Sequence, residues 1–92
     1  MKNDLATTER IFKALGNRRR LAIVQFLKGR KEASVGDIAD AIKLSFKSTS
    51  KHLAILVAVQ ILEREQKNLY MFYSISNPGL MSRFVRTLVF VL

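Results

Sequence analysis

A three-residue break between two short helical segments constrains this chain more than any other feature. Before the break, Ser34 and Asp37 stand in the S-x-x-D spacing of a capping box, which opens a helix. After Lys43-Leu44-Ser45, the Ser45 side chain can cap a second helix over residues 46–57. The side chains expected to be buried repeat at helical spacing in both segments: Val35, Ile38, Ala39 and Ile42, then Thr49, Leu53, Leu56 and Val57. Two short helices joined by such a turn are the helix-turn-helix pattern, here over residues 35–57.

Two further helices are predicted before this pattern. Residues 8–15 and 18–28 have apolar side chains at helical spacing. Thr8 and Asn17 are the expected N-caps, and Gly16 and Gly29 are the expected ends.

A hairpin and a last helix are predicted after it. Residues 61–66 and 69–75 predict strands joined by a turn at Lys67 and Asn68, which gives the hairpin a basic tip. Residues 78–92 predict a helix with a wide apolar face. The whole order predicts one domain over residues 1–92, mainly α with a small β-hairpin. This is the winged helix-turn-helix fold, with the wing at residues 61–75.

Charge and composition limit the function. Sixteen Lys and Arg against seven Asp and Glu give a net charge of +9, which favours a polyanionic partner, either nucleic acid or an anionic membrane surface. The absence of cysteine and the single histidine disfavour a metal site, and we expect no cofactor. Asp4 and Glu9 interrupt the N-terminus, so we expect no signal peptide and a cytoplasmic protein.

The second helix of the pattern predicts a surface that reads DNA. If Thr49, Leu53 and Leu56 face the core, small hydroxyl and cationic side chains fall on the outward side. Such side chains can approach phosphates and base edges in the major groove, whereas on most helices they only form a solvated face. The predicted contacts in this segment are Ser45, Lys47, Ser48, Thr49, Ser50, Lys51 and His52.

Ser50 and His52 could also be considered as a catalytic pair. Ser50 and His52 show neither an acid partner nor a glycine-rich oxyanion turn, so we expect no enzyme. We expect His52 to be half-buried and bonded within its helix or to the hairpin, with a phosphate contact as the alternative.

The segments "ALGNRRRLAIVQFL" (14–27), "SVGDIADAI" (34–42), "LSFKSTSKHLAIL" (44–56) and "FYSI" (72–75) resemble the arsenical-resistance-repressor (ArsR) family of dimeric winged-helix repressors. The resemblance covers residues 8–76, and Ser50 to Leu53 is its most specific part. It implies a homodimer formed through the first and last helices, which binds a two-fold symmetric operator in double-stranded DNA. It also implies backbone contacts from the wing at Arg64, Lys67 and Asn68. The implied dimer contacts are Ile11, Leu80, Met81, Phe84, Val85 and Leu88.

Four features depart from the family pattern or stay open. Ser34 and Gly36 stand where metal-sensing relatives carry cysteines, which argues against metal sensing. Phe46 stands where a polar residue is frequent; we expect it to pack on the neighbouring helix, with a thymine methyl as the alternative. Gln60 stands where glycine is frequent. Of the run Arg18 to Arg20, we expect one arginine to bind a carboxylate or a helix end and the others to be solvated, with a phosphate contact as the alternative.

Two interpretations remain open for the role of the last helix, and two for the function of the protein. Residues 80–92 are too few to cross a bilayer and contain Arg83 and Arg86, so we expect a dimer contact rather than a membrane anchor. The predicted function is a sequence-specific transcriptional regulator, most simply a repressor. A nonspecific DNA-coating protein is the alternative, because the charge alone would suffice for it. The sequence specifies neither an operator nor a small-molecule effector.

Overall fold

Side-chain caps set where four of the helices begin. The computed structural model describes residues 4–77 and 83–92. In chain order its elements are α1 (Leu5–Leu15), α2 (Arg18–Leu27), β1 (Ala33–Ser34), α3 (Val35–Ile42), α4 (Phe46–Ala58), β2 (Leu62–Lys67), β3 (Tyr70–Ile75) and α5 (Arg83–Val91). The side chains of Asn17, Ser34 and Ser45 accept hydrogen bonds from the first-turn amides of α2, α3 and α4. These are the predicted caps, because each satisfies amides that have no partner within the helix.

Helix α1 begins earlier than predicted. Asp4, and not Thr8, is its N-cap: the Asp4 Oδ1 accepts a hydrogen bond of 2.7 Å from the Thr7 amide. The hydrogen bonds from the Thr7 backbone and side chain lower the pKa of Asp4. The Asp4 carboxylate can cap as well as a threonine hydroxyl, and the residues between the two candidates continue the helix. Gly16 ends α1 as predicted, and its amide donates to the Phe12 carbonyl.

The hairpin belongs to a three-stranded antiparallel sheet with the order β1-β3-β2. Strand β1, which the sequence pattern did not predict, pairs Ala33 with Tyr73; two residues are too few to show a period. In the hairpin, Lys67 pairs with Tyr70. The turn therefore consists of Asn68 and Leu69, one residue later than predicted, with Asn68 in the left-handed conformation at φ 57°.

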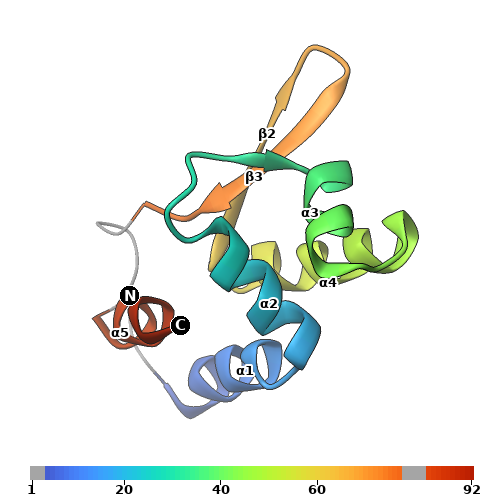
Figure 1. The fold of residues 1–92 in the computed structure, drawn as a ribbon. Coiled ribbons are helices and arrows are strands. Elements are labelled where there is room, and N and C mark those ends of the chain that lie inside the picture. Colours follow the sequence, from blue (N-terminus) through green and yellow to red (C-terminus); the bar gives the residue numbers. More distant parts are fainter. Residues whose placement is uncertain (1–3, 78–82) are drawn as a thin grey trace.

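One hydrophobic core joins the helices to the sheet. Helix α2 lies at its centre, and Ile23, Val24 and Leu27 are fully buried there. Side chains from the other elements complete the core: Ile38, Leu53, Leu56, Ile61, Leu62 and Tyr73. Figure 1 shows the hairpin β2–β3 projecting away from this helical body, with α3 and α4 on one side and α1 and α5 toward the other.

Helix α5 packs on this same core. Val85 and Val89 are buried in it, and α2 holds the end of α5 through the Gln25 Nε2 atom, which donates to the Leu92 carbonyl at 3.0 Å. The Lys28 ammonium also donates to the Phe90 carbonyl. The predicted start of the last helix at residue 78 lies outside the described residues. The predicted winged helix-turn-helix fold is confirmed.

Candidate nucleic-acid interface

The turn between α3 and α4 fixes the direction of α4. Lys43 adopts the left-handed conformation at φ 56°, and the Leu44 amide donates to the Ala39 carbonyl at 3.0 Å. This is the geometry of a helix C-terminus that closes on itself. Two residues later, the Ser45 hydroxyl accepts from the Ser48 amide at 3.1 Å and starts α4. These hydrogen bonds end α3 and begin α4 at the three-residue break that the sequence predicted.

Helix α4 presents a cationic side to solvent. Lys47, Lys51 and Ala54 are exposed, and Ser48 and Ser50 are half-buried at the edges of that side. The helix contains no Asp or Glu. The opposite side, made of Thr49, Leu53 and Leu56, is fully buried. Two lysines one turn apart, between small hydroxyl side chains, form a surface that can approach a polyanion closely.

Thr49 cannot be one of the contacts that we predicted for DNA. Its side chain is 0% exposed. Its hydroxyl also has no hydrogen-bond partner among the described residues. The helical period also predicted Thr49 on the buried side of this helix, and that prediction is confirmed.

His52 bonds to α2, and to neither of the partners that we expected. The His52 Nδ1 atom lies 3.0 Å from an Arg20 guanidinium nitrogen. Because arginine only donates, Nδ1 accepts and the ring proton is on Nε2. Burial lowers the pKa of His52, and the neighbouring charges of Arg20 and Arg19 lower it further. The ring is therefore neutral at pH 7 and half-buried at the edge of the cationic side.

Arg20 also binds the end of α1. Its Nε donates to the Ala14 carbonyl at 2.6 Å, and a second guanidinium nitrogen donates to the Lys13 carbonyl at 3.3 Å. Arg19 likewise donates to the Ile42 carbonyl at the end of α3, at 3.4 Å. Two arginines of the run therefore bind helix ends, whereas we expected one to do so and the other two to be solvated. These bonds join α1, α3 and α4 to the first turn of α2.

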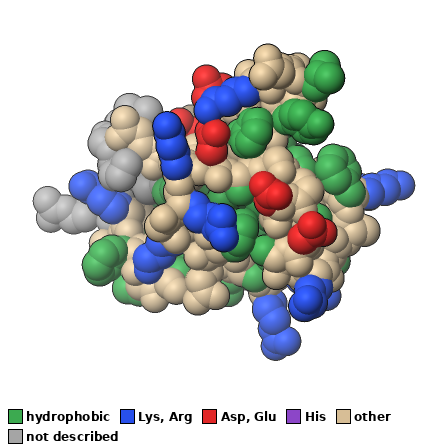
Figure 2. Space-filling view, turned by 45° about the horizontal axis from the view of Figure 1, so that its top comes forward, with side chains coloured by type: hydrophobic (Ala, Val, Ile, Leu, Met, Phe, Trp, Pro, Cys, Tyr) green, Lys and Arg blue, Asp and Glu red, His purple; other side chains and the backbone are tan. Residues whose placement is uncertain are grey.

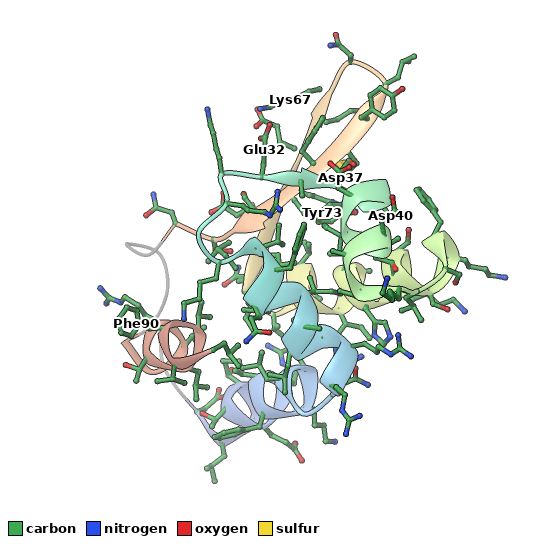
Figure 3. The ribbon with its side chains drawn as sticks, in the orientation of Figure 1. Glu32, Asp37, Asp40, Lys67, Tyr73 and Phe90 are labelled. Carbon is green, nitrogen blue, oxygen red and sulfur yellow. The ribbon has the colours of Figure 1, made fainter. Side chains whose placement is uncertain are left out.

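The wing is less basic at its tip than predicted. Lys67 binds Glu32, with its ammonium 2.8 and 2.9 Å from the two carboxylate oxygens, and Figure 3 shows the two side chains meeting beside the sheet. The hydrogen bond to Glu32 raises the pKa of Lys67. Leu69, 90% exposed, occupies the turn instead. Arg64 and Asn68 are exposed, as a backbone contact requires.

Phe46, the first residue of α4, is 62% exposed. The expectation that it packs on the neighbouring helix is therefore wrong for most of its ring. Across the surface in Figure 2, Lys and Arg side chains project from several sides, with hydrophobic and acidic side chains between them. On the face shown, the positive charge is therefore not confined to one patch, and the arrangement of α4 defines the site better than charge alone.

Comparison with known proteins places this geometry in a family. Residues 10–65 match a family model described as "Helix-turn-helix domain". The transcriptional repressor SdpR of Bacillus subtilis (strain 168) is 33% identical over 70 residues, which cover 76% of this chain and 77% of SdpR. The chain belongs to the ArsR family of winged helix-turn-helix regulators. It is accordingly a DNA-binding transcriptional regulator.

Solved structures of ArsR-type regulators superpose on nearly the whole chain. HlyU from Vibrio cholerae N16961 has a TM-score of 0.80 at 28% identity, with 99% of this chain and 92% of HlyU covered. The repressor PagR of Bacillus anthracis has a TM-score of 0.76 at 28% identity, with 95% and 93% covered. The homodimeric domain Mb0332 of Mycobacterium bovis, described as "a possible ArsR-family transcriptional regulator", reaches 0.80 at 28% identity, with 95% and 75% covered.

The dimer contacts implied by the ArsR resemblance fall into three groups. Ile11 and Val85 are 8% and 5% exposed and lie in the core of the single chain, so a second copy would find little of them to cover. Leu88 is half-buried and lines a surface groove of about 210 Å³ together with Phe12 and Val91. Leu80 and Met81 lie outside the described residues, as does the side chain of Phe84.

Apolar surface remains at this end of the ArsR-family chain. Phe12 on α1 and Phe90 and Val91 on α5 are exposed. No helix within the described residues is both long and apolar enough to cross a membrane. Over residues 4–77 and 83–92, no three His, Cys, Asp or Glu side chains group closely enough to hold a metal ion.

Several functional contacts were not visible in the sequence. Glu32 stands next to Lys31 and gave no signal that it would bind Lys67, 35 positions along the chain. The partner of His52 is 32 positions away in Arg20. The conformation of Gln60, in contrast, was indicated by the sequence, because relatives often have glycine at this position. Its backbone is left-handed, at φ 64°.

Proposed function

We propose that this chain is a homodimeric transcriptional repressor that places α4 of each copy in successive major grooves of a two-fold symmetric operator. The observation that carries the proposal is the solvent side of α4, where Lys47 and Lys51 are exposed on a helix without acids. Ser48 and Ser50 border these lysines and can reach base edges or phosphates. SdpR and PagR are both described as transcriptional repressors, which supports repression rather than activation.

The wing would contact the DNA backbone on either side of the reading helix. Arg64 and Asn68 are exposed on the hairpin and are the proposed contacts. Lys67 is bound to Glu32 in the free protein, so a phosphate would compete with that carboxylate for its ammonium. Ser45 keeps a capping role, and its hydroxyl hydrogen stays available for a phosphate.

A second copy would cover the apolar end of the molecule. Phe12, Phe90 and Val91 are exposed there, and Leu88 lies beside them in the groove. The homodimeric state of Mb0332 supports a dimer, and Leu80, Met81 and Phe84 remain predicted members of its interface. The chain would act in the cytoplasm, by occupying DNA and not by catalysing a reaction.

Selection of DNA from a random pool tests the specificity. The pool is double-stranded and binding is carried out in 200 mM salt, where contacts to phosphates alone are weak. We expect a sequence of two inverted half-sites, one helical turn apart, to be enriched. A pool that binds without enrichment would support the alternative, a DNA-coating protein, which the net charge of +9 favours.

The assembly needs a separate test with a surface substitution. Deleting the last helix would expose core residues, because Val85 and Val89 are buried. Val91→Glu instead places a charge on the exposed apolar surface, and we expect a monomer in sedimentation velocity. Ala41→Glu adds the same charge at an exposed position on α3 and should leave a dimer. A dimeric Val91→Glu protein would show that this end of α5 is not the interface.

A further inference from the structure

An aromatic ring stands at the front of the helix proposed to read DNA. Phe46 is the first residue of α4, directly after the Ser45 cap, and 62% of its surface is exposed. In the described part of the chain, the other exposed aromatic side chains lie elsewhere, on α1, on the hairpin and on α5. A single exposed apolar residue is ordinary. Its position is not, because the first residues of a reading helix are those that reach the base edges.

The chemistry of the ring restricts what it can recognise. A phenyl group has no donor or acceptor, so it cannot pair with the N7, O6, N6 or N4 groups that distinguish most bases. The apolar group displayed in the major groove is the C5-methyl of thymine, and phenylalanine is one of the side chains that contact it. Contact with that methyl would remove the exposed ring from water, as burial of apolar surface favours.

The neighbouring side chains would hold the ring against the base. Lys47 follows directly and is exposed, and Ser50 lies one turn further along on the same flank as Phe46. Both can bind phosphate oxygens, which fixes the register of a helix without selecting a sequence. The C-terminal turn of α3 and the Ser45 cap set the direction in which the ring leaves α4.

We propose that Phe46 is a specificity-determining residue that reads a thymine in each half-site through its C5-methyl group. The inference rests on the proposed function, since it requires that α4 enters the major groove. It extends that function by assigning one base to one side chain. The polar contacts of Lys47, Ser48 and Ser50 would then select or position the remaining bases.

A double-mutant cycle tests the assignment. The selected operator is synthesised with deoxyuridine in place of each thymine in turn, in one half-site, which removes only the methyl group. Affinities are measured by fluorescence anisotropy at one fixed salt concentration for the wild-type dimer and for Phe46→Ala. At one thymine we expect the wild type to lose about fourfold in affinity, the value of one buried methyl group. Phe46→Ala should bind both DNAs equally, and Phe46→Leu should keep part of the difference.

Two outcomes would overturn the inference. In the first, no thymine in the operator shows a loss with wild type. In the second, Phe46→Ala retains the same loss as wild type, so that the ring does not read the methyl; if the variant also binds every DNA more weakly by the same factor, the ring contacts the backbone. Failure of the proposed function is a different result: wild type would then enrich no sequence in the initial selection, before any cycle is measured.

Folding of the variants is checked in the same experiment. Because Phe46 is mostly exposed, we expect Phe46→Ala to melt at the wild-type temperature. Tyr70→Ala is a matched control that removes an exposed aromatic side chain from the hairpin, outside the proposed DNA contacts and the proposed dimer surface. It should leave the thymine-to-deoxyuridine loss unchanged at about fourfold.

Discussion

Replacing Thr49 by valine separates the stability of α4 from its contact with DNA. Thr49 is completely buried on the same side of α4 as Leu53 and Leu56, and its hydroxyl has no hydrogen-bond partner among the described residues. A buried hydroxyl without a partner costs about 1–3 kcal/mol. Valine has nearly the same shape and a similar helix propensity, so it removes that cost without leaving a cavity. We expect the free energy of unfolding to rise by about 1 kcal/mol.

Thermal and urea denaturation measure this change. For a domain of this size, about 1 kcal/mol corresponds to a rise in Tm of about 4–8 °C. Wild type and variant are compared at one chain concentration, because dimerisation makes Tm depend on concentration. Thr49→Ser is the matched control: it keeps the hydroxyl and loses the buried methyl, so it should be less stable than wild type.

The same variant tests the correction to the predicted DNA contacts. Thr49→Val should bind the selected operator with the wild-type Kd, because no part of the side chain reaches the surface. A loss of stability of about 1 kcal/mol in Thr49→Val would refute the reasoning, since it would show that the hydroxyl has a partner such as a buried water. A loss of affinity with unchanged stability would return Thr49 to the interface.

Three other predictions each concern a single residue or ion pair. Gln60→Gly should raise the free energy of unfolding by about 1 kcal/mol in urea, because Gln60 is left-handed, whereas Gln60→Ala should give no gain. Lowering the pH from 8 to 5.5 should destabilise the fold through His52: its folded pKa lies below the unfolded value of about 6.5, so the unfolded chain takes up the proton first. In His52→Gln the free energy of unfolding should depend less on pH over this range. An unchanged pH dependence would assign the effect to another group. Glu32→Gln should release Lys67, strengthen binding to all DNA sequences alike and steepen the salt dependence by about one phosphate contact; an unchanged slope would show that Lys67 does not reach the backbone.

Local chemistry made the helix-turn-helix predictable. Ser34, Ser45 and Asn17 cap helices from positions that their own side chains determine, within three residues of the amides they bind. The helical period then decides which side of α4 is buried once Leu53 and Leu56 are assigned to the core. These features depend on neighbours in the chain, so the sequence by itself determined the order of the helices and the hairpin and the cationic side of the reading helix. It did not determine strand β1, which forms by pairing with β3.

The tertiary structure decided which distant side chains bind one another and which are buried. The ion pair of Glu32 with Lys67 and the bond of Arg20 with His52 join residues 35 and 32 positions apart, which the folding of the sheet and of α2 brings together. Burial of Val85 in the core likewise depends on where α5 packs. Such contacts arise from the meeting of distant segments, and no local pattern of charge or hydrophobicity encodes which segments meet.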